Sequence, residues 1–258
     1  MGGADPRTRL AGALLQHTLN MRDNGAAVPP RRYQPSRDKE IFPISRSSTP
    51  SHPRRRLGTP AIIAEALRLV REDGLAAVTM RRLADELGTA PMSLYRHVAD
   101  RQALLILMLD EVAAGIRLPP PVGDPRSEIT VVLTAIHDAL RCDSWAVRLI
   151  VTDKLAGPSI VPVLERLFSA LRRAGLAPRD CMVAYALLWH YIAGELLDAH
   201  PGAANDAFSR ELVRAADPLT YPALAEAVAA FPPGPPGDWF TENLQRLLDG
   251  LLPPTVAR

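Results

Sequence analysis

The spacing of hydrophobic residues predicts an all-α chain from residue 59 onward. Apolar side chains recur every three to four positions in successive segments, and no segment shows the alternation of a half-buried strand. Proline or glycine closes most segments, because proline lacks a backbone N–H and glycine readily adopts the left-handed backbone of a helix end. We therefore expect helices near 59–74, 79–88, 91–98, 100–116, 127–141, 144–156, 158–174, 178–199, 220–230 and 238–251.

Capping residues mark where the first helices begin. Thr59 precedes Pro60 and is expected to cap the first helix, because a missing N–H costs nothing at the first helical position. Thr79 and Asp100 stand at the same point of two later helices. Four apolar residues are spaced to pin the short helices against the first one: Leu83, Leu87, Leu94 and Val98.

Residues 1–56 lack a helical pattern and are rich in Pro, Ser, Gly and Arg, so we predict that they are mostly disordered. Residues 1–57 hold eleven Arg or Lys against four acidic residues, whereas the whole chain has a net charge of only +2. Such a basic end suits approach to a polyanion, although a solvated tail is an equal alternative. Arg54, Arg55 and Arg56 directly precede the first helix, where a basic arm can reach a minor groove.

A length of 258 residues favours two domains after this extension. We expect a basic extension at 1–56, a three-helix domain at 57–103 and a larger helical bundle at 104–258. The two cysteines, Cys142 and Cys181, form neither a disulfide framework nor a metal-ligand pattern, which indicates a reducing cytoplasm.

No segment predicts a membrane partner or an enzyme. The longest nearly uncharged apolar stretch, Met182–Gly194, is shorter than the roughly 18 residues of a membrane span, and no signal peptide is visible. The chain has no His-Glu-x-x-His helix, glycine-rich phosphate loop or Gly-x-Ser-x-Gly elbow. Glu195 and Asp198 share a helix face, but pairs of acidic residues on one helix are common and do not by themselves indicate a catalytic site. We expect a cytoplasmic protein that is not an enzyme and that has no metal or cofactor.

The segment around residues 79–98 predicts a helix-turn-helix, because two short helices are joined by a turn containing glycine. The residue sequence of this segment identifies it more specifically than the predicted pair of short helices does. The chain reads Val78-Thr79-Met80-Arg81-Arg82-Leu83-Ala84-Asp85-Glu86-Leu87-Gly88, then Ser93-Leu94-Tyr95-Arg96-His97-Val98, then Asp100-Arg101-Gln102-Ala103-Leu104-Leu105. In these residues it resembles the N-terminal domain of the tetracycline-repressor (TetR) family.

Several side chains on or beside the second short helix can donate hydrogen bonds to phosphates or base edges, although a polar solvent face is the alternative. These donors are Arg81, Ser93, Tyr95, Arg96, His97 and Arg101. The resemblance implies that double-stranded operator DNA contacts Arg81, Met92, Ser93, Tyr95, His97 and Arg101. It also implies phosphate contacts for Tyr95 and His97. Arg96 replaces an aromatic residue of the tetracycline repressor, so we expect a different operator, with Arg96 reading bases.

The C-terminal half is expected to pair two subunits, because one short recognition helix contacts too little DNA for useful specificity. The stretch Cys181–Leu197 and the last helix are too apolar to face water on all sides, although both could belong wholly to the core of their own domain. In the last helix the apolar residues are Phe240, Leu244, Leu247, Leu248 and Leu251. The resemblance implies a four-helix bundle between subunits, which favours a homodimer.

The resemblance extends through the C-terminal half to the corresponding domain of the tetracycline repressor, which implies a small-molecule site. Lys154 and Arg117 stand near the positions of that protein's metal-binding and drug-contacting histidines, so we do not expect a magnesium-tetracycline complex. Trp145, Trp189 and His190 are candidates for lining a pocket, although such residues are more often packed core.

These features predict a ligand-responsive transcriptional repressor. It binds palindromic operator DNA as a homodimer and is released by a small-molecule inducer whose identity is unknown. The alternative is an architectural or activating DNA-binding protein without an inducer.

Overall fold

The structure is a computed structural model that describes residues 57–198, 211–230 and 239–254. Its α-helices are α2 (Thr59–Asp73), α3 (Met80–Glu86), α4 (Pro91–Leu94), α5 (Arg101–Ala114), α6 (Pro125–Cys142), α7 (Ser144–Arg148), α8 (Val161–Arg173), α9 (Pro178–Asp198), α11 (Pro222–Ala230) and α12 (Trp239–Leu251). Short helices of other types are η1 (Leu75–Ala77), η2 (Leu149–Asp153) and η3 (Pro158–Ile160). No strand occurs within the described ranges, and the all-α prediction is confirmed.

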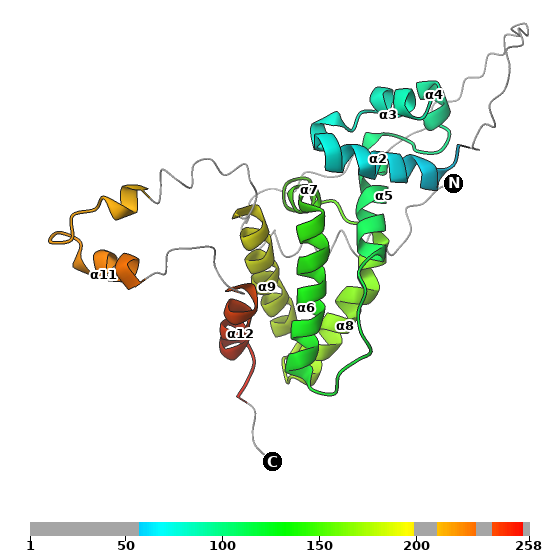
Figure 1. The fold of residues 1–258 in the computed structure, drawn as a ribbon. Helices are drawn as coiled ribbons and strands as arrows, with labels where there is room; N and C mark the ends of the chain where they lie inside the picture. The colour runs from blue at the N-terminus through cyan, green and yellow to red at the C-terminus, as the bar shows by residue number, and fades with distance from the viewer. Residues whose placement is uncertain (1–56, 199–210, 231–238, 255–258) are drawn as a thin grey trace, which may run out of the picture.

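The helices form two groups that α5 connects (Figure 1). α2, α3 and α4 lie together at one end, and α5 packs against α2 before running alongside the second group. In that group α6, α8 and α9 pack on one another, and α12 packs on α6 and α9. α11 lies apart from this bundle. Because α5 contacts both groups, a shift of α5 moves the short helices relative to the bundle.

The hydrophobic pattern of the first helices is confirmed by burial. The buried residues of α2 are Ile62, Ile63, Ala66, Leu67, Leu69 and Val70. Leu83, Leu94 and Val98 are also buried, while Leu87 is partly buried against the same core. The core continues without a break from α2 through α5 into the bundle.

Helix starts follow the expected caps with one exception. Asp100 accepts a hydrogen bond from the Ala103 N–H at 2.7 Å, and the Thr79 side chain accepts one from the Arg82 N–H at 3.2 Å. The prediction that Thr59 caps α2 is wrong, because Thr59 is already helical and the extended Gly58 is the N-cap. Gly58 lacks a capping side chain, so its carbonyl, which accepts the first helical bonds, fixes this helix start.

The single helix expected at 144–156 is interrupted. The short α7 passes into the π-helical turn η2, and Lys154 ends it with left-handed backbone at φ 56°. The Thr152 hydroxyl donates to the Arg148 carbonyl at 2.8 Å within this stretch. Such back-bonding competes with the regular helical ladder, and periodicity alone does not reveal it.

A buried carboxylate fixes the loop between α5 and α6. Glu128 is 1% exposed, binds the Arg166 Nε and accepts a hydrogen bond from the Val122 N–H at 2.7 Å. Arg166 also donates to the Pro119 carbonyl at 2.6 Å. These bonds hold the loop against α6 and α8, and the Arg166 guanidinium lowers the pKa of Glu128.

We predict that acid weakens the fold through Glu128. Its pKa is depressed in the folded state, so its stabilisation is complete above the ordinary carboxylate pKa of about 4.3 and is lost as pH falls through the lower folded value. Glu128→Gln should reduce the free energy of unfolding by about 1–3 kcal/mol at pH 7 and flatten its decline below pH 5. Urea titrations from pH 3 to 7 measure this.

The matched control is Glu165→Gln, which changes an exposed glutamate on the neighbouring helix α8. It should leave both the stability at pH 7 and the acid dependence unchanged. Equal pH profiles for Glu128→Gln and the unaltered chain would remove Glu128 from this role.

No helix among the described residues is long and apolar enough to cross a membrane. Residues 1–56, including Arg54, Arg55 and Arg56, lie outside the described ranges, so the predicted disorder and basic arm stay predictions.

Candidate DNA interface and apolar cavity

The turn that contains α4 presents polar and aromatic side chains to solvent. Its two apolar members, Leu94 and Val98, are 0% and 2% exposed and anchor the turn in the core. The residues between and around them face outward: Arg81, Met92, Tyr95, Arg96, His97 and Arg101 are exposed, and Ser93 is half-buried. The structure therefore brings all seven described candidates for DNA contact to one end of the molecule, on and beside α4.

Two arginines in this group already have partners within the chain. Arg96 donates to the Ser93 hydroxyl at 3.1 Å, which holds the guanidinium close to α4. Arg101 donates from Nε to the Val78 carbonyl at 3.0 Å, and a terminal nitrogen reaches the Leu75 carbonyl at 3.3 Å. Arg101 therefore also fixes the segment between η1 and α3.

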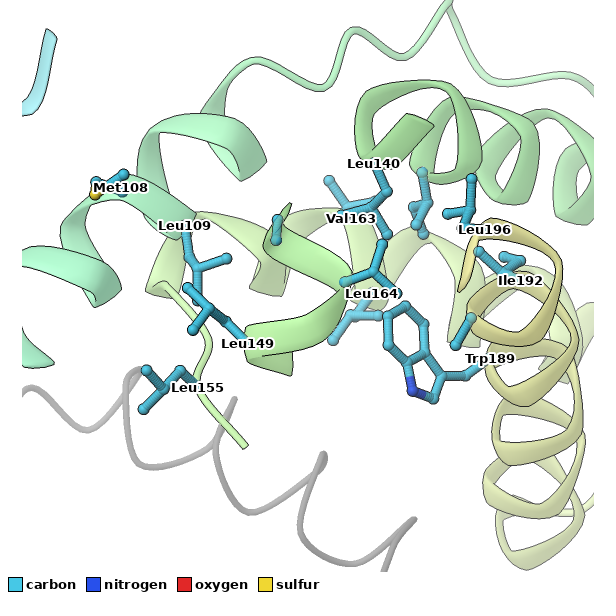
Figure 2. Packing of buried hydrophobic residues seen from close by; sticks show 14 of the residues in the cluster. Met108, Leu109, Leu140, Leu149, Leu155, Val163, Leu164, Trp189, Ile192 and Leu196 are labelled. Atoms are coloured by element: carbon cyan, nitrogen blue, oxygen red, sulfur yellow. The ribbon is translucent and has the colours of Figure 1, made fainter. Parts of the chain in front are cut away.

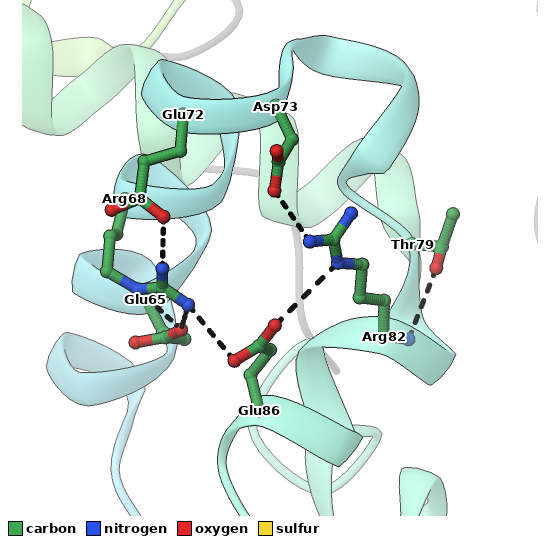
Figure 3. A network of polar contacts seen from close by, with 7 residues as sticks. All are labelled: Glu65, Arg68, Glu72, Asp73, Thr79, Arg82 and Glu86. Atoms are coloured by element: carbon green, nitrogen blue, oxygen red, sulfur yellow. Dashed lines mark hydrogen bonds and ion pairs between the residues drawn. The ribbon is translucent and has the colours of Figure 1, made fainter.

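A network of ion pairs ties α2 to α3 beside this turn (Figure 3). Arg68 of α2 reaches Glu86 at 3.1 Å, and Arg82 of α3 binds Asp73 at 2.6 Å. Arg82 also lies 3.8 Å from Glu86, so the two arginines share one carboxylate. Each exposed pair contributes little alone, but together they restrict how α3 sits on α2.

A second set of bonds joins α2 to the bundle. Arg71 donates two hydrogen bonds to the Asp143 carboxylate, at 2.8 and 2.9 Å, and the Trp145 indole N–H donates to the same group at 3.0 Å. Asp143 is only 6% exposed, and its hydrogen bond raises the pKa of Arg71. Sequence reasoning did not single out Arg71 or Asp143, because nothing local in the chain links two residues so far apart.

The bundle holds a partly open apolar cavity of about 70 Å³, lined by α5, α6, α8 and α9 together with residues of η2, η3 and the segment between them. It is lined by Leu109, Val112, Ala113, Ile116, Leu133, Ile136, Ala139, Leu140, Ile150, Ala156, Gly157, Ile160, Leu164, Tyr185, Trp189 and Ile192. Figure 2 shows Trp189 extending from α9 toward Leu164 within this cluster. No lining residue carries a formal charge.

The three sequence-predicted ligand residues occupy different environments. Trp189 lines the cavity and is 6% exposed. Trp145 instead donates to Asp143 near α2, outside the lining, and His190 is exposed on α9 and is not part of the lining. Tyr185 is the second aromatic residue of the lining, and burial raises its pKa to about 12. Within the described residues no group of three or more metal-binding side chains occurs.

One face of α9 is apolar yet open to solvent. Leu187 and Leu197 are 47% and 41% exposed, Val183 is half-buried, and an added Cβ at Gly194 would meet no atom within 4 Å. With His190, these residues follow the three-and-four spacing of a single helix face. In α12, by contrast, Phe240, Leu244 and Leu248 are buried in the chain's own core.

Comparison with known families matches most of the described chain. Residues 62–108 match "Bacterial regulatory proteins, tetR family", and residues 119–253 match "Tetracyclin repressor-like, C-terminal domain". The first match runs from within α2 to the middle of α5 and includes the α4 turn, and the second covers the helices from α6 onward. The α5 residues of the cavity wall lie between the two matches.

Individual relatives agree with these matches. An HTH-type transcriptional regulator of Saccharopolyspora erythraea is 33% identical over 201 residues, covering 74% of this chain and 82% of that protein. The HTH-type transcriptional repressor DrrR1 of Streptomyces coeruleorubidus is 29% identical over 213 residues, covering 77% and 78%. The crystal structure of ActR from Streptomyces coelicolor in complex with actinorhodin has a TM-score of 0.65 at 26% identity, covering 76% of this chain and 96% of ActR.

Proposed function

The chain belongs to the tetR family of bacterial regulatory proteins, and on that premise we propose that it represses transcription as a homodimer bound to palindromic operator DNA and released by a small molecule. Membership confirms the resemblance found in the sequence, and it makes the chain a DNA-binding transcriptional regulator with a helix-turn-helix. The operator, the dimer, the repression and the release belong to the proposal.

The observation that carries the proposal is the exposed α4 turn. Leu94 and Val98 hold it in the core, while Tyr95, Arg96 and His97 point to solvent with donors for phosphates and base edges. The network between α2 and α3 restricts how α3, against which α4 packs, sits on α2. We assign DNA contact to the seven described candidates, with residues 57–103 as the DNA-binding domain.

The open face of α9 supports the homodimer. A monomer would leave Leu187 and Leu197 in water, whereas a two-fold partner would cover the same face on both subunits. Two α4 turns are then held at a fixed separation, as a palindromic operator requires. We assign residues 104–258 to pairing and ligand binding.

The cavity supports release by a small molecule. A volume of about 70 Å³ is well under the roughly 150 Å³ apolar cavity that accepts benzene, so a larger ligand must push the walls apart. Leu109, Val112, Ala113 and Ile116 place α5 among those walls. Because α5 carries the short helices, widening the cavity changes the separation of the two α4 turns.

The proposal is tested by placing a selected operator between a promoter and a reporter gene. Expression of the full chain should lower reporter output, and deletion of either half-site should restore it. Increased output would indicate an activator, and output independent of the operator would indicate that the chain does not regulate through this site.

We predict that Arg96→Ala changes sequence preference more than overall affinity. Arg96 is exposed in the turn directly after α4, where a guanidinium can bind a guanine edge, and each such contact discriminates by about 1–3 kcal/mol. Tyr95→Phe, which removes a phosphate donor, should instead weaken binding to every sequence alike. Dissociation constants for a series of single-base operator variants measure both effects.

Arg141→Ala is the control, because Arg141 is an exposed arginine of α6 and does not belong to the helix-turn-helix. This substitution should leave the dissociation constants of all the operator variants unchanged. A uniform loss of affinity across all variants with Arg96→Ala would remove base reading from Arg96.

A further inference from the structure

Two buried aromatic residues line the cavity with polar groups that lack partners. Tyr185 is 5% exposed and Trp189 is 6% exposed, and both come from α9. No hydrogen bond joins the Tyr185 hydroxyl or the Trp189 indole N–H to any other residue that the structure describes. Neither atom is completely enclosed, because the one fully buried side-chain nitrogen or oxygen without a partner among the described residues is Arg166 Nη2. Both donors therefore remain open to a bound molecule, and a ligand that covers them must offer an acceptor in place of water.

Both groups act as donors. The indole N–H can only donate, and the phenol can donate or accept. Because burial raises the pKa of Tyr185 to about 12, the hydroxyl keeps its proton at neutral pH and remains a donor. The group that both can satisfy is a hydrogen-bond acceptor, and none is present in the rest of the cavity's side-chain lining.

The remaining lining excludes a charged ligand. It consists of aliphatic side chains and Gly157, with no Lys, Arg, His, Asp or Glu to pair with an ion. A carboxylate or an amine moved from water into such a site loses its solvation without compensation. A neutral molecule pays no such cost and buries apolar surface against α5, α6 and α8.

From these observations we infer that the effector is an uncharged, largely apolar molecule with an accepting oxygen such as a ketone carbonyl, bound by Tyr185 and Trp189. This inference rests on the proposed function for its regulatory meaning, and it deepens that function by naming the ligand class. It assigns Tyr185 and Trp189 to ligand specificity rather than to packing alone.

Three probes of similar shape test separately whether the ligand needs an accepting oxygen and whether it must be uncharged: acetophenone, ethylbenzene and benzoate. Acetophenone has the accepting oxygen, ethylbenzene lacks it, and benzoate replaces it with a charge. Calorimetric titration of the full chain should give binding of acetophenone about three- to tenfold tighter than ethylbenzene for one hydrogen bond, and no binding of benzoate. Binding of benzoate as tight as that of acetophenone, or equal binding of the two neutral probes, would overturn the inference, as would binding of none of them.

Tyr185→Phe and Trp189→Phe remove the donors while keeping aromatic side chains in the lining. Each should reduce the preference for acetophenone over ethylbenzene and leave ethylbenzene binding within about twofold. Tyr185→Phe removes only an unpaired oxygen, so its Tm should not fall, and it keeps the test valid if Trp189→Phe is unstable. An unchanged acetophenone preference in Tyr185→Phe would contradict the assignment whether or not Trp189→Phe is stable, and a stable Trp189→Phe with an unchanged preference would contradict the role of Trp189.

Operator binding by the same preparations separates this inference from the proposed function. If the chain binds a palindromic operator but the three probes do not bind in the expected order, the inferred ligand class is wrong and the proposed regulatory function is unaffected. If the probes bind in the expected order but the chain prefers no operator, the inferred ligand class is retained and the proposed function is wrong.

Discussion

Gly157→Ala is expected to push α5 away from the bundle, destabilising the fold and weakening operator binding. A Cβ added at Gly157 would lie 2.4 Å from the Asp110 Cα and 2.6 Å from its backbone nitrogen, both on α5. Backbone atoms cannot rotate aside, and carbon atoms pack best at 3.5–4.0 Å, so the two segments must separate by about 1 Å. The Ser159 N–H, which donates to the Asp110 carboxylate at 2.6 Å, lies at the same junction.

Overpacking of this kind costs about 1–3 kcal/mol, which urea unfolding measures. If the chain still folds, operator affinity should fall at least tenfold, because α5 carries the α4 turn. Gly123→Ala is the control, since a Cβ there meets no atom within 4 Å, and it should change neither quantity. Wild-type stability and operator affinity in Gly157→Ala would show that the contact between α5 and η3 does not control the short helices.

Leu187→Arg is expected to separate the two subunits. Leu187 lies in the middle of the open α9 face and is 47% exposed in the single chain. A two-fold interface places the change in both copies, and a central position contributes about 2 kcal/mol or more per copy. The dimer dissociation constant should rise roughly a thousandfold, and operator affinity should collapse because one α4 turn contacts one half-site.

Analytical ultracentrifugation across a concentration series measures the first effect, and operator titration measures the second. Leu219→Arg makes the same chemical change at a leucine that is 93% exposed outside this face, so it should leave the dimer intact. An unchanged dimer in Leu187→Arg would move the interface away from this part of α9.

Local rules predicted much of the fold. Helix boundaries at Thr79, Asp100 and Gly74 follow from side-chain capping and from backbone freedom, which residue type determines directly. Gly74 takes φ 79°, a conformation that glycine adopts without strain. The break in the expected helix at 144–156 depends instead on Lys154, whose left-handed backbone is set by its surroundings.

The two candidate sites also differ in how far the sequence could predict them. The candidate DNA-contact residues lie close together in sequence, so the apolar anchors Leu94 and Val98 already indicate that their polar neighbours face outward. The cavity is assembled from four helices, and helical periodicity marks Trp145 and Trp189 alike as apolar-face residues. Only packing distinguishes them: Trp189 reaches the cavity, whereas Trp145 meets Asp143.

Local sequence patterns could not predict the long-range polar contacts either, because these contacts join residues that only the fold brings together. Arg71 and Asp143 each look like ordinary surface charges in the sequence. Their pairing across two helix groups leaves Asp143 buried and places the Trp145 N–H on the same carboxylate. The neutrality of the cavity likewise emerges only when residues from separate helices are brought together.

Selection of bound sequences from a random duplex library by the full chain tests the central claim most directly. The claim is that two copies of the α4 turn, held apart by paired bundles, insert into successive turns of one DNA face. The account predicts enrichment of a palindrome whose half-sites lie about 10 bp, or one helical turn, apart and that binds two chains. Enrichment of no palindrome, with a single chain bound equally to random duplexes, would contradict it.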